Sequence, residues 1–134
     1  MMSPYLNQTY YTVSNHTSVV SCLRILPDGT MASGSWDTTI QIWNLTSRSV
    51  LKTLSHSDLV YSIDVLSTSL LASGSYDRSI LVWNFATGQL IKNISNAHSW
   101  EITAVKNLND YYFATGSYQG VKVGLRFYFY LFQN

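Results

Sequence analysis

The chain has 134 residues, of which 46% are apolar and 11% charged, and its formal net charge is +1. This composition is that of a globular domain, and the scattered charges offer no basic surface for nucleic acid or anionic lipid. The longest strongly apolar stretch, residues 123–132, is too short to span a bilayer and includes Arg126, so we expect neither a nucleic acid nor a membrane partner.

Four short strands are predicted in the first part of the chain, at residues 19–26, 30–35, 39–43 and 50–54. Pro27-Asp28-Gly29 is a strong turn signal between the first two strands, and Trp36-Asp37 forms a tight turn before the third. In the third strand, Ile40 and Ile42 share one face while Trp43 lies on the other. Apolar side chains on both faces predict a sheet that is sandwiched between two neighbours.

The same pattern of strands then returns, at residues 59–66, 70–75, 79–83 and 89–94. Ile80 and Val82 repeat the positions of Ile40 and Ile42, and Trp83 repeats that of Trp43. The chain also begins out of phase with this pattern. Residues 9–14 precede His16 as residues 50–54 precede His56, which predicts an outer strand of a preceding unit.

A third unit begins at His98 and is incomplete. Strands are predicted at residues 101–108 and 112–117, but Gln119 stands where the turn aspartate belongs. Val121 and Val123 match Ile40 and Ile42 only after a one-residue deletion, which places Gly124 where tryptophan is expected. The residues after Gly124 resemble nothing upstream.

The strongest regularity is a six-residue sequence motif that recurs at a period near 40 residues. Ala-Ser-Gly-Ser-Trp-Asp at 32–37 returns as Ala-Ser-Gly-Ser-Tyr-Asp at 72–77 and as Ala-Thr-Gly-Ser-Tyr-Gln at 114–119. A histidine precedes each copy, and Trp-Asn follows the first two. This phased set resembles the WD-repeat β-propeller family, with Trp-Asn in place of Trp-Asp. The resemblance implies four-stranded blades arranged radially around a channel.

We therefore predict an all-β fold, an incomplete WD-repeat propeller with two complete four-stranded blades and a degraded third. The predicted divisions are a tail with an outer strand at 1–15, repeats at 16–55 and 56–97, a partial repeat at 98–123 and an aromatic tail at 124–134. At about 40–45 residues per blade, this length supplies three blades at most, fewer than the four that close the smallest ring.

Open sheet faces and edges would result, and three explanations stay open: a fragment of a longer propeller, a truncated product or gene model, or a unit that closes by self-association. The segment Phe127–Phe132 is apolar, uncharged and free of proline and glycine. If it is exposed, we expect it to favour aggregation.

Recurring polar residues invite comparison with a Ser-His-Asp hydrolase, but the family resemblance implies a buried structural tetrad in each blade. Carried over by position, the tetrads are His16, Ser33, Asp37 and Trp43 in the first unit, and His56, Ser73, Asp77 and Trp83 in the second. The third unit keeps only His98 and Thr115. A buried network of this kind rigidifies a blade when every polar group has a partner, and we expect no catalysis from it.

Aromatic residues that the repeat does not need are candidates for partner binding. In the family, the residue before the turn aspartate points to the top face, as do positions three and five residues after the loop histidine. The candidates are Trp36, Leu59, Tyr61, Tyr76, Trp100, Glu101 and Tyr118. Two interpretations stay open, because such residues either anchor a peptide or protein or pack laterally against neighbouring blades.

Other chemistry is not indicated. Cys22 aligns with the small residues Ser62 and Ala104, which favours a packing role over a reactive thiol. The three histidines lie about 40 residues apart without ligand spacing, and we expect no metal and no cofactor. One cysteine allows no internal disulfide, and the N-terminus does not resemble a signal peptide. These features predict an intracellular protein, cytoplasmic or nuclear.

The function that we expect is a non-catalytic scaffold that binds a protein or peptide through the top face. The alternatives are a propeller fragment with only a structural or self-association role, whose partner is the rest of a propeller or another copy, and an enzyme module. A fold by itself does not select among the pathways that such scaffolds serve.

Overall fold

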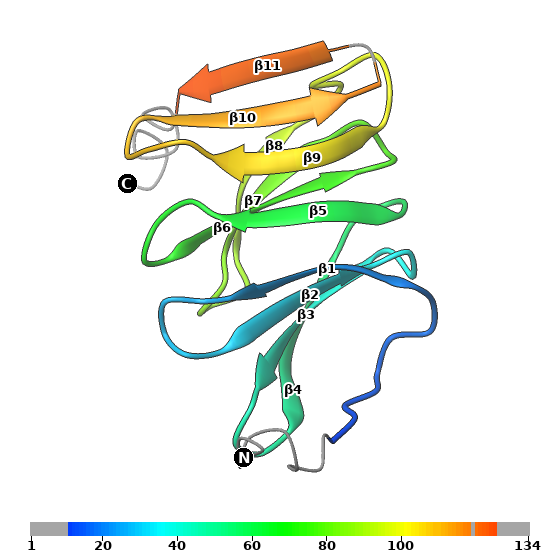
Figure 1. Ribbon diagram of the computed structural model, residues 1–134, viewed down its shortest axis with the longest axis vertical. Coiled ribbons are helices and arrows are strands. Elements are labelled where there is room, and N and C mark those ends of the chain that lie inside the picture. The colour runs from blue at the N-terminus through cyan, green and yellow to red at the C-terminus, as the bar shows by residue number, and fades with distance from the viewer. Residues whose placement is uncertain (1–10, 119, 126–134) are drawn as a thin grey trace, which may run out of the picture.

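The computed structural model describes residues 11–118 and 120–125, which form three small antiparallel sheets stacked in chain order (Figure 1). The first sheet contains β1 (Val20–Ile25), β2 (Met31–Ser35), β3 (Thr39–Asn44) and β4 (Ser49–Ser55). The second contains β5 (Val60–Val65), β6 (Leu70–Ser75), β7 (Ile80–Asn84) and β8 (Leu90–Ile94). The third contains β9 (Ile102–Asn107), β10 (Tyr112–Ser117) and β11 (Gly120–Leu125).

The all-β prediction and the order of the strands are confirmed. Each sheet is a meander in which sequential strands are neighbours, and β1, β5 and β9 lie side by side along one edge of the stack. The described residues form no closed ring. They contain no helix, and therefore none that is long and apolar enough to cross a membrane.

The outer strand that was expected at residues 9–14 is not formed in the part that the structure describes. Residues 11–16 have no regular structure, and residues 9 and 10 lie outside the described range. A strand needs the edge of a sheet with which to pair, and residues 11–16 pair with none of the described strands. The aromatic segment Phe127–Phe132 also lies outside the described residues.

The apolar residues on both faces of the second sheet are buried as the sandwich prediction required. Ile63 and Leu71 pack with Ile40 and Ile42 of the first sheet in one core cluster. On the opposite face, Ile80 and Val82 pack with β9 and β10 of the third sheet in a second cluster. The second sheet is therefore the only one of the three described sheets that is covered on both sides.

Two glycines let the sheets approach closely. A Cβ atom on Gly34 would lie 2.8 Å from Val60 Cγ1, and one on Gly74 would lie 2.5 Å from Ile102 Cγ2 and 2.8 Å from Val105 Cγ2. These separations are shorter than any ordinary carbon–carbon contact. The glycine of the Ala-Ser-Gly-Ser motif is thus the position at which the side chains of the next sheet contact the backbone.

The register of the third sheet confirms the predicted deletion. Val121 and Val123 face Gly116 and Ala114, as Ile40 and Ile42 face Gly34 and Ala32. Gly124 pairs with Phe113 and so occupies the tryptophan position. The ring of Phe113 lies over this glycine, because a Cβ atom there would be 2.8 Å from Phe113 Cε1.

Candidate functional site

The first predicted tetrad extends into the sheet from the end where β1 begins and β2 ends, which we call the top end. His16 Nδ1 lies 2.7 Å from Asp37 Oδ2, and His16 Nε2 lies 2.7 Å from Ser33 Oγ. Trp43 Nε1 donates to the same Ser33 oxygen at 2.8 Å. The directly bonded side chains are 10, 17 and 21 positions apart in the sequence, yet the four form one continuous hydrogen-bonded network.

The second tetrad repeats this arrangement with little change. His56 Nδ1 lies 3.0 Å from Asp77 Oδ2, and His56 Nε2 lies 2.6 Å from Ser73 Oγ. Trp83 Nε1 donates to Ser73 Oγ at 3.0 Å. In the neutral form of the ring, Nδ1–H donates to the carboxylate and Nε2 accepts from the serine hydroxyl. Each polar side-chain group of this tetrad then has a partner.

The turn that holds each aspartate is fixed by hydroxyl groups that the prediction did not include. Thr39 Oγ1 donates to Asp37 Oδ1 at 2.6 Å, and Ser79 Oγ donates to Asp77 Oδ1 at 2.5 Å. The hydroxyl of Ser75 accepts from the Asp77 backbone N–H at 3.1 Å. The signal was present in the sequence, because both units carry a hydroxyl residue two positions before and two positions after the aspartate.

The two turn carboxylates are held in their ionised form. Burial alone would raise the pKa of each, but hydrogen bonds outweigh burial and keep both pKa values well below the ordinary 3.8. For Asp77 the strongest of these bonds come from His56 and Ser79, and for Asp37 they come from Thr39. An ionised acceptor inside a partly buried turn strengthens the bonds it receives.

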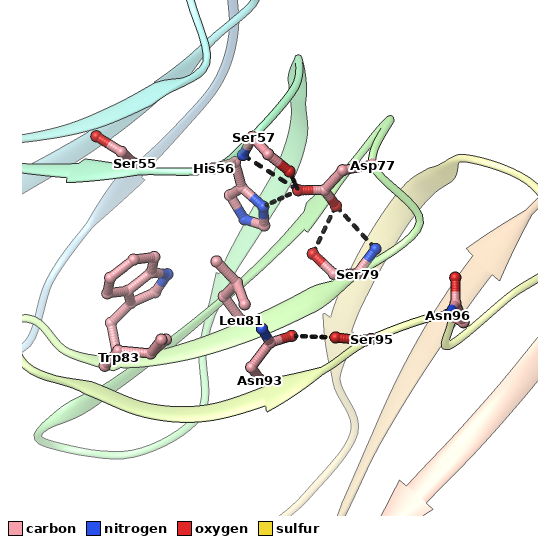
Figure 2. A pocket seen from close by; sticks show the side chains of 11 residues that line it. Ser55, His56, Ser57, Asp77, Ser79, Leu81, Trp83, Asn93, Ser95 and Asn96 are labelled. Carbon is pink, nitrogen blue, oxygen red and sulfur yellow. Dashed lines mark hydrogen bonds and ion pairs between the residues drawn. The ribbon is translucent and has the colours of Figure 1, made fainter.

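In the second tetrad, Ser73 contacts His56, which contacts Asp77, as in a catalytic triad. This arrangement does not make the serine accessible as a nucleophile. Ser73 is fully buried, and its hydroxyl oxygen already contacts both His56 and Trp83. A cavity of about 450 Å³ opens beside the network, with His56 and Asp77 on one wall (Figure 2). The described residues that line this cavity do not include Ser73. A substrate in the cavity would therefore meet no reactive hydroxyl from the tetrad.

The third unit keeps only half of the network, as its sequence indicates. His98 Nε2 lies 2.8 Å from Thr115 Oγ1. Burial and the positive charge of Lys122 lower the pKa of His98. Without the aspartate that anchors the other two rings, this histidine has no ionised partner among the residues that the structure describes.

The predicted aromatic candidates come together at the top end in a row that crosses two sheets. The rings of Trp36 and Tyr61 lie 6.4 Å apart edge to face, and those of Tyr61 and Tyr76 lie 6.3 Å apart. Trp36 and Tyr76 are exposed, and Tyr61 is half-buried between them. The row therefore packs across the sheets, as the lateral-packing interpretation predicts, and it still presents aromatic surface to solvent.

A second aromatic pair continues this surface on the third sheet. The rings of Trp100 and Tyr118 lie 6.3 Å apart, and both side chains are exposed. A cavity of about 460 Å³ separates this pair from the row and is lined by Tyr76, Trp100 and Glu101 together with Asp58, Asp77, Arg78 and Ser99. Leu59 is half-buried and holds the row in place through its backbone, since its carbonyl accepts from the Tyr76 N–H.

Cys22 lies half-buried against the first core cluster, where burial raises the pKa of its thiol. A protonated, packed thiol agrees with the packing role predicted for this residue. No group of three or more metal-binding side chains occurs within residues 11–118 and 120–125.

The repeat, the sheets and the paired tetrads have a match among known families. The family model of the WD domain, G-beta repeat, matches residues 7–44 and 48–84, which is more than half of the sequence. The chain belongs to the WD40 repeat family. No curated protein sequence matches it.

The second matched WD40 repeat, residues 48–84, runs from β4, the outer strand of the first sheet, to β7, the third strand of the second sheet. A repeat is therefore shifted by one strand from a sheet of the structure. The third sheet lies outside both matches, and it is also the sheet that lacks the turn aspartate and the tryptophan. WD40 repeat domains generally act as protein-interaction scaffolds and are typically non-catalytic.

Proposed function

We propose that this chain is a non-catalytic interaction scaffold that binds a peptide or protein segment at the top end of its sheets. The observation that supports this most directly is the aromatic row of Trp36, Tyr61 and Tyr76, because it is ordered by ring contacts and still exposed. Rigid aromatic side chains contribute large contact area with little loss of conformational entropy, which is why they dominate binding hot spots. The intracellular location stays a prediction.

The cavity between the second and third sheets favours a basic side chain of the partner. Its walls carry the aromatic rings of Tyr76 and Trp100 and the carboxylates of Asp58 and Glu101. A cation gains from aromatic faces and from carboxylates together. Arg78 is the one basic residue on the described lining, so acidic groups predominate. We expect a Lys- or Arg-containing segment to insert there while its neighbours lie along the row.

Selection from a library of random linear peptides displayed on phage, with the full chain immobilised, tests this function. We expect the selected peptides to be enriched in Lys and Arg. Tyr76→Ala should weaken their binding by about tenfold or more, as removal of a hot-spot aromatic does, with little change in stability.

Tyr111→Ala is the matched control, because Tyr111 is an exposed tyrosine on the β9–β10 turn at the opposite end of the third sheet. Its removal should leave peptide binding unchanged. Peptides that bind equally well to the Tyr76→Ala protein would contradict the assignment. A loss of folding in that variant would instead favour a packing role for the tyrosine.

A further inference from the structure

The two outward faces of the stack expose side chains that are buried at the equivalent positions inside it. Val60 and Ile63 of β5 are both 0% exposed against the first sheet, whereas Val20 and Leu23, which hold the same register in β1, are 47% and 52% exposed. We call Val20, Leu23 and their neighbour Ile25 the Val20 face. Its side chains are apolar and branched, like those of β5 that cover the first sheet.

The opposite end of the stack shows the complementary surface. Ile40 and Ile42 are 0% and 2% exposed beneath the second sheet, whereas their counterparts Val121 and Val123 are 74% and 60% exposed. Gly116 belongs to the same surface, and a Cβ atom there would meet only Ala104 of its own sheet, at 3.5 Å. We call Gly116, Val121 and Val123 the Val121 face.

The internal sheet contacts supply a template for joining these two faces. At the two contacts that the structure contains, residues equivalent to Val20 and Leu23 rest on a glycine and on two β-branched residues. The Val121 face offers the same glycine and the same pair of β-branched residues. We propose that a second copy of this chain is the occupant, with its Val20 face seated on the Val121 face of the first.

A polar contact at the internal junction is also reproduced. Ser21 Oγ lies 3.2 Å from the Gly34 carbonyl and 2.5 Å from the Val60 carbonyl of the next sheet. Thr103 holds the equivalent place, with its hydroxyl 3.4 Å from the Gly116 carbonyl. In the joined copies this hydroxyl donates to the carbonyl of Val20 of the second copy.

The position of the N-terminal segment fits the same arrangement. The Tyr11 ring lies 3.7 Å from the guanidinium of Arg48, and its hydroxyl donates to the Leu45 carbonyl at 3.1 Å. Further along the same segment, the Asn15 carbonyl accepts from Gln41 Nε2 of β3 at 3.2 Å. The segment therefore contacts the first sheet without pairing with a described strand. In the joined copies, β11 of the first copy supplies the sheet edge that this segment lacks.

Joining of this kind is head to tail, because one face meets a different face of the partner. Two copies contribute six sheets, which lies within the four to eight blades of closed propellers. Two identical contacts then close the ring and leave neither face exposed. The aromatic row is not part of either face, so this association and the proposed peptide binding succeed or fail independently.

One charge works against the contact and gives a sensitive test. Arg24 Nε donates to Asp64 Oδ1 at 3.2 Å across the first internal junction, whereas the residue equivalent to Asp64 in the third sheet is Lys106. In the joined copies Lys106 meets Arg24 of the second copy. Lys106→Asp should therefore tighten the association, by about fivefold for a partly exposed ion pair.

Sedimentation velocity on the full chain over a concentration series measures the association. We expect a species of twice the 15.1-kDa chain mass. Leu23→Glu and Val121→Glu should each abolish it, and an equimolar mixture of the two variants should restore a dimer through the one pair of faces that stays intact. Gly116→Ala should weaken it while leaving room in the monomer, and Tyr111→Glu is the matched surface control.

Several results would contradict the head-to-tail association of two copies. A monomer at every concentration, or open-ended assemblies larger than a dimer, would overturn the two-copy ring. A dimer that survives Leu23→Glu but not Val121→Glu would mean that like faces meet. Failure of the mixture to restore the dimer, with both variants folded by circular dichroism, would also overturn the head-to-tail contact.

Discussion

The hydroxyl of Ser73 shows how one small side chain connects three others. Its oxygen accepts from the indole of Trp83 and lies within hydrogen-bonding distance of the imidazole of His56, which in turn contacts Asp77. Removing any member leaves a buried polar group without its partner, and that desolvation outweighs the bond itself. The tetrad is therefore better suited to fixing a turn than to supplying a reactive group.

Asp77→Ala should reduce the free energy of unfolding by about 1–3 kcal/mol, because His56 and Ser79 lose an ionised acceptor. Chemical denaturation of the single variants Asp77→Ala and His56→Ala and of the double variant measures the coupling. A double variant about as unstable as the worse single variant is expected for residues in one network. Strictly additive effects, or an unchanged stability in Asp77→Ala, would rule out the network.

At the scale of elements, the contact between sheets depends on β2 and β6 presenting a bare glycine. The next sheet packs its branched side chains onto Gly34 or Gly74, so the inner strands approach more closely than side chains would allow. In the third sheet a different side chain fills the place of the tryptophan. Gly124 stands at the tryptophan position of β11, and the ring of Phe113 on the neighbouring strand fills the space over this glycine.

Gly74→Ala should destabilise the protein by about 1–3 kcal/mol, because the new methyl group would overlap Ile102 and Val105 of the third sheet. Gly116→Ala is the matched control, because Gly116 holds the same place in the third copy of the motif. It should change the free energy of unfolding of the isolated chain by no more than about 0.5 kcal/mol. Thermal or denaturant unfolding of both variants measures the difference. Equal effects at the two glycines would contradict the account of how the sheets stack.

For the whole molecule, burial is distributed unevenly along the stack. The second sheet is covered on both faces, whereas the first and third each leave one apolar face exposed among the described residues. Stability in such an array is approximately the sum of each unit and its contacts with neighbours. The middle sheet is therefore the most stable part, and the outer sheets open more readily.

Native-state hydrogen exchange should show this gradient. We expect the amides of β6 and β7 to exchange most slowly, those of the first sheet faster, and those of β11 fastest, because β11 is both an edge strand and part of an exposed face. Conditions that favour association should slow exchange in β1 and β11 selectively. Uniform protection across the three sheets would contradict the picture of a stack with two open faces.

The sequence alone determined the strands and their order, because the period of the repeat fixes which residues share a place in successive sheets. The tetrad of His56, Ser73, Asp77 and Trp83 was implied by the family resemblance and carried over by position, and the structure brings the four side chains together. The deletion before Val121 was also readable, since a single register accounts for both Val121 and Gly124. The positions of the strands and their register can therefore be predicted from the repeat, without reference to long-range packing.

Only the tertiary structure decided what the repeat does not encode. Residues 11–16 read as part of an outer strand but form none, because a strand requires a sheet edge that lies beyond the local sequence. The aromatic row likewise depends on how neighbouring sheets are placed, since Trp36 and Tyr61 come from different sheets. The exposure of Val121, where Ile40 is buried, reflects the absence of a described neighbour rather than any property of the residue itself.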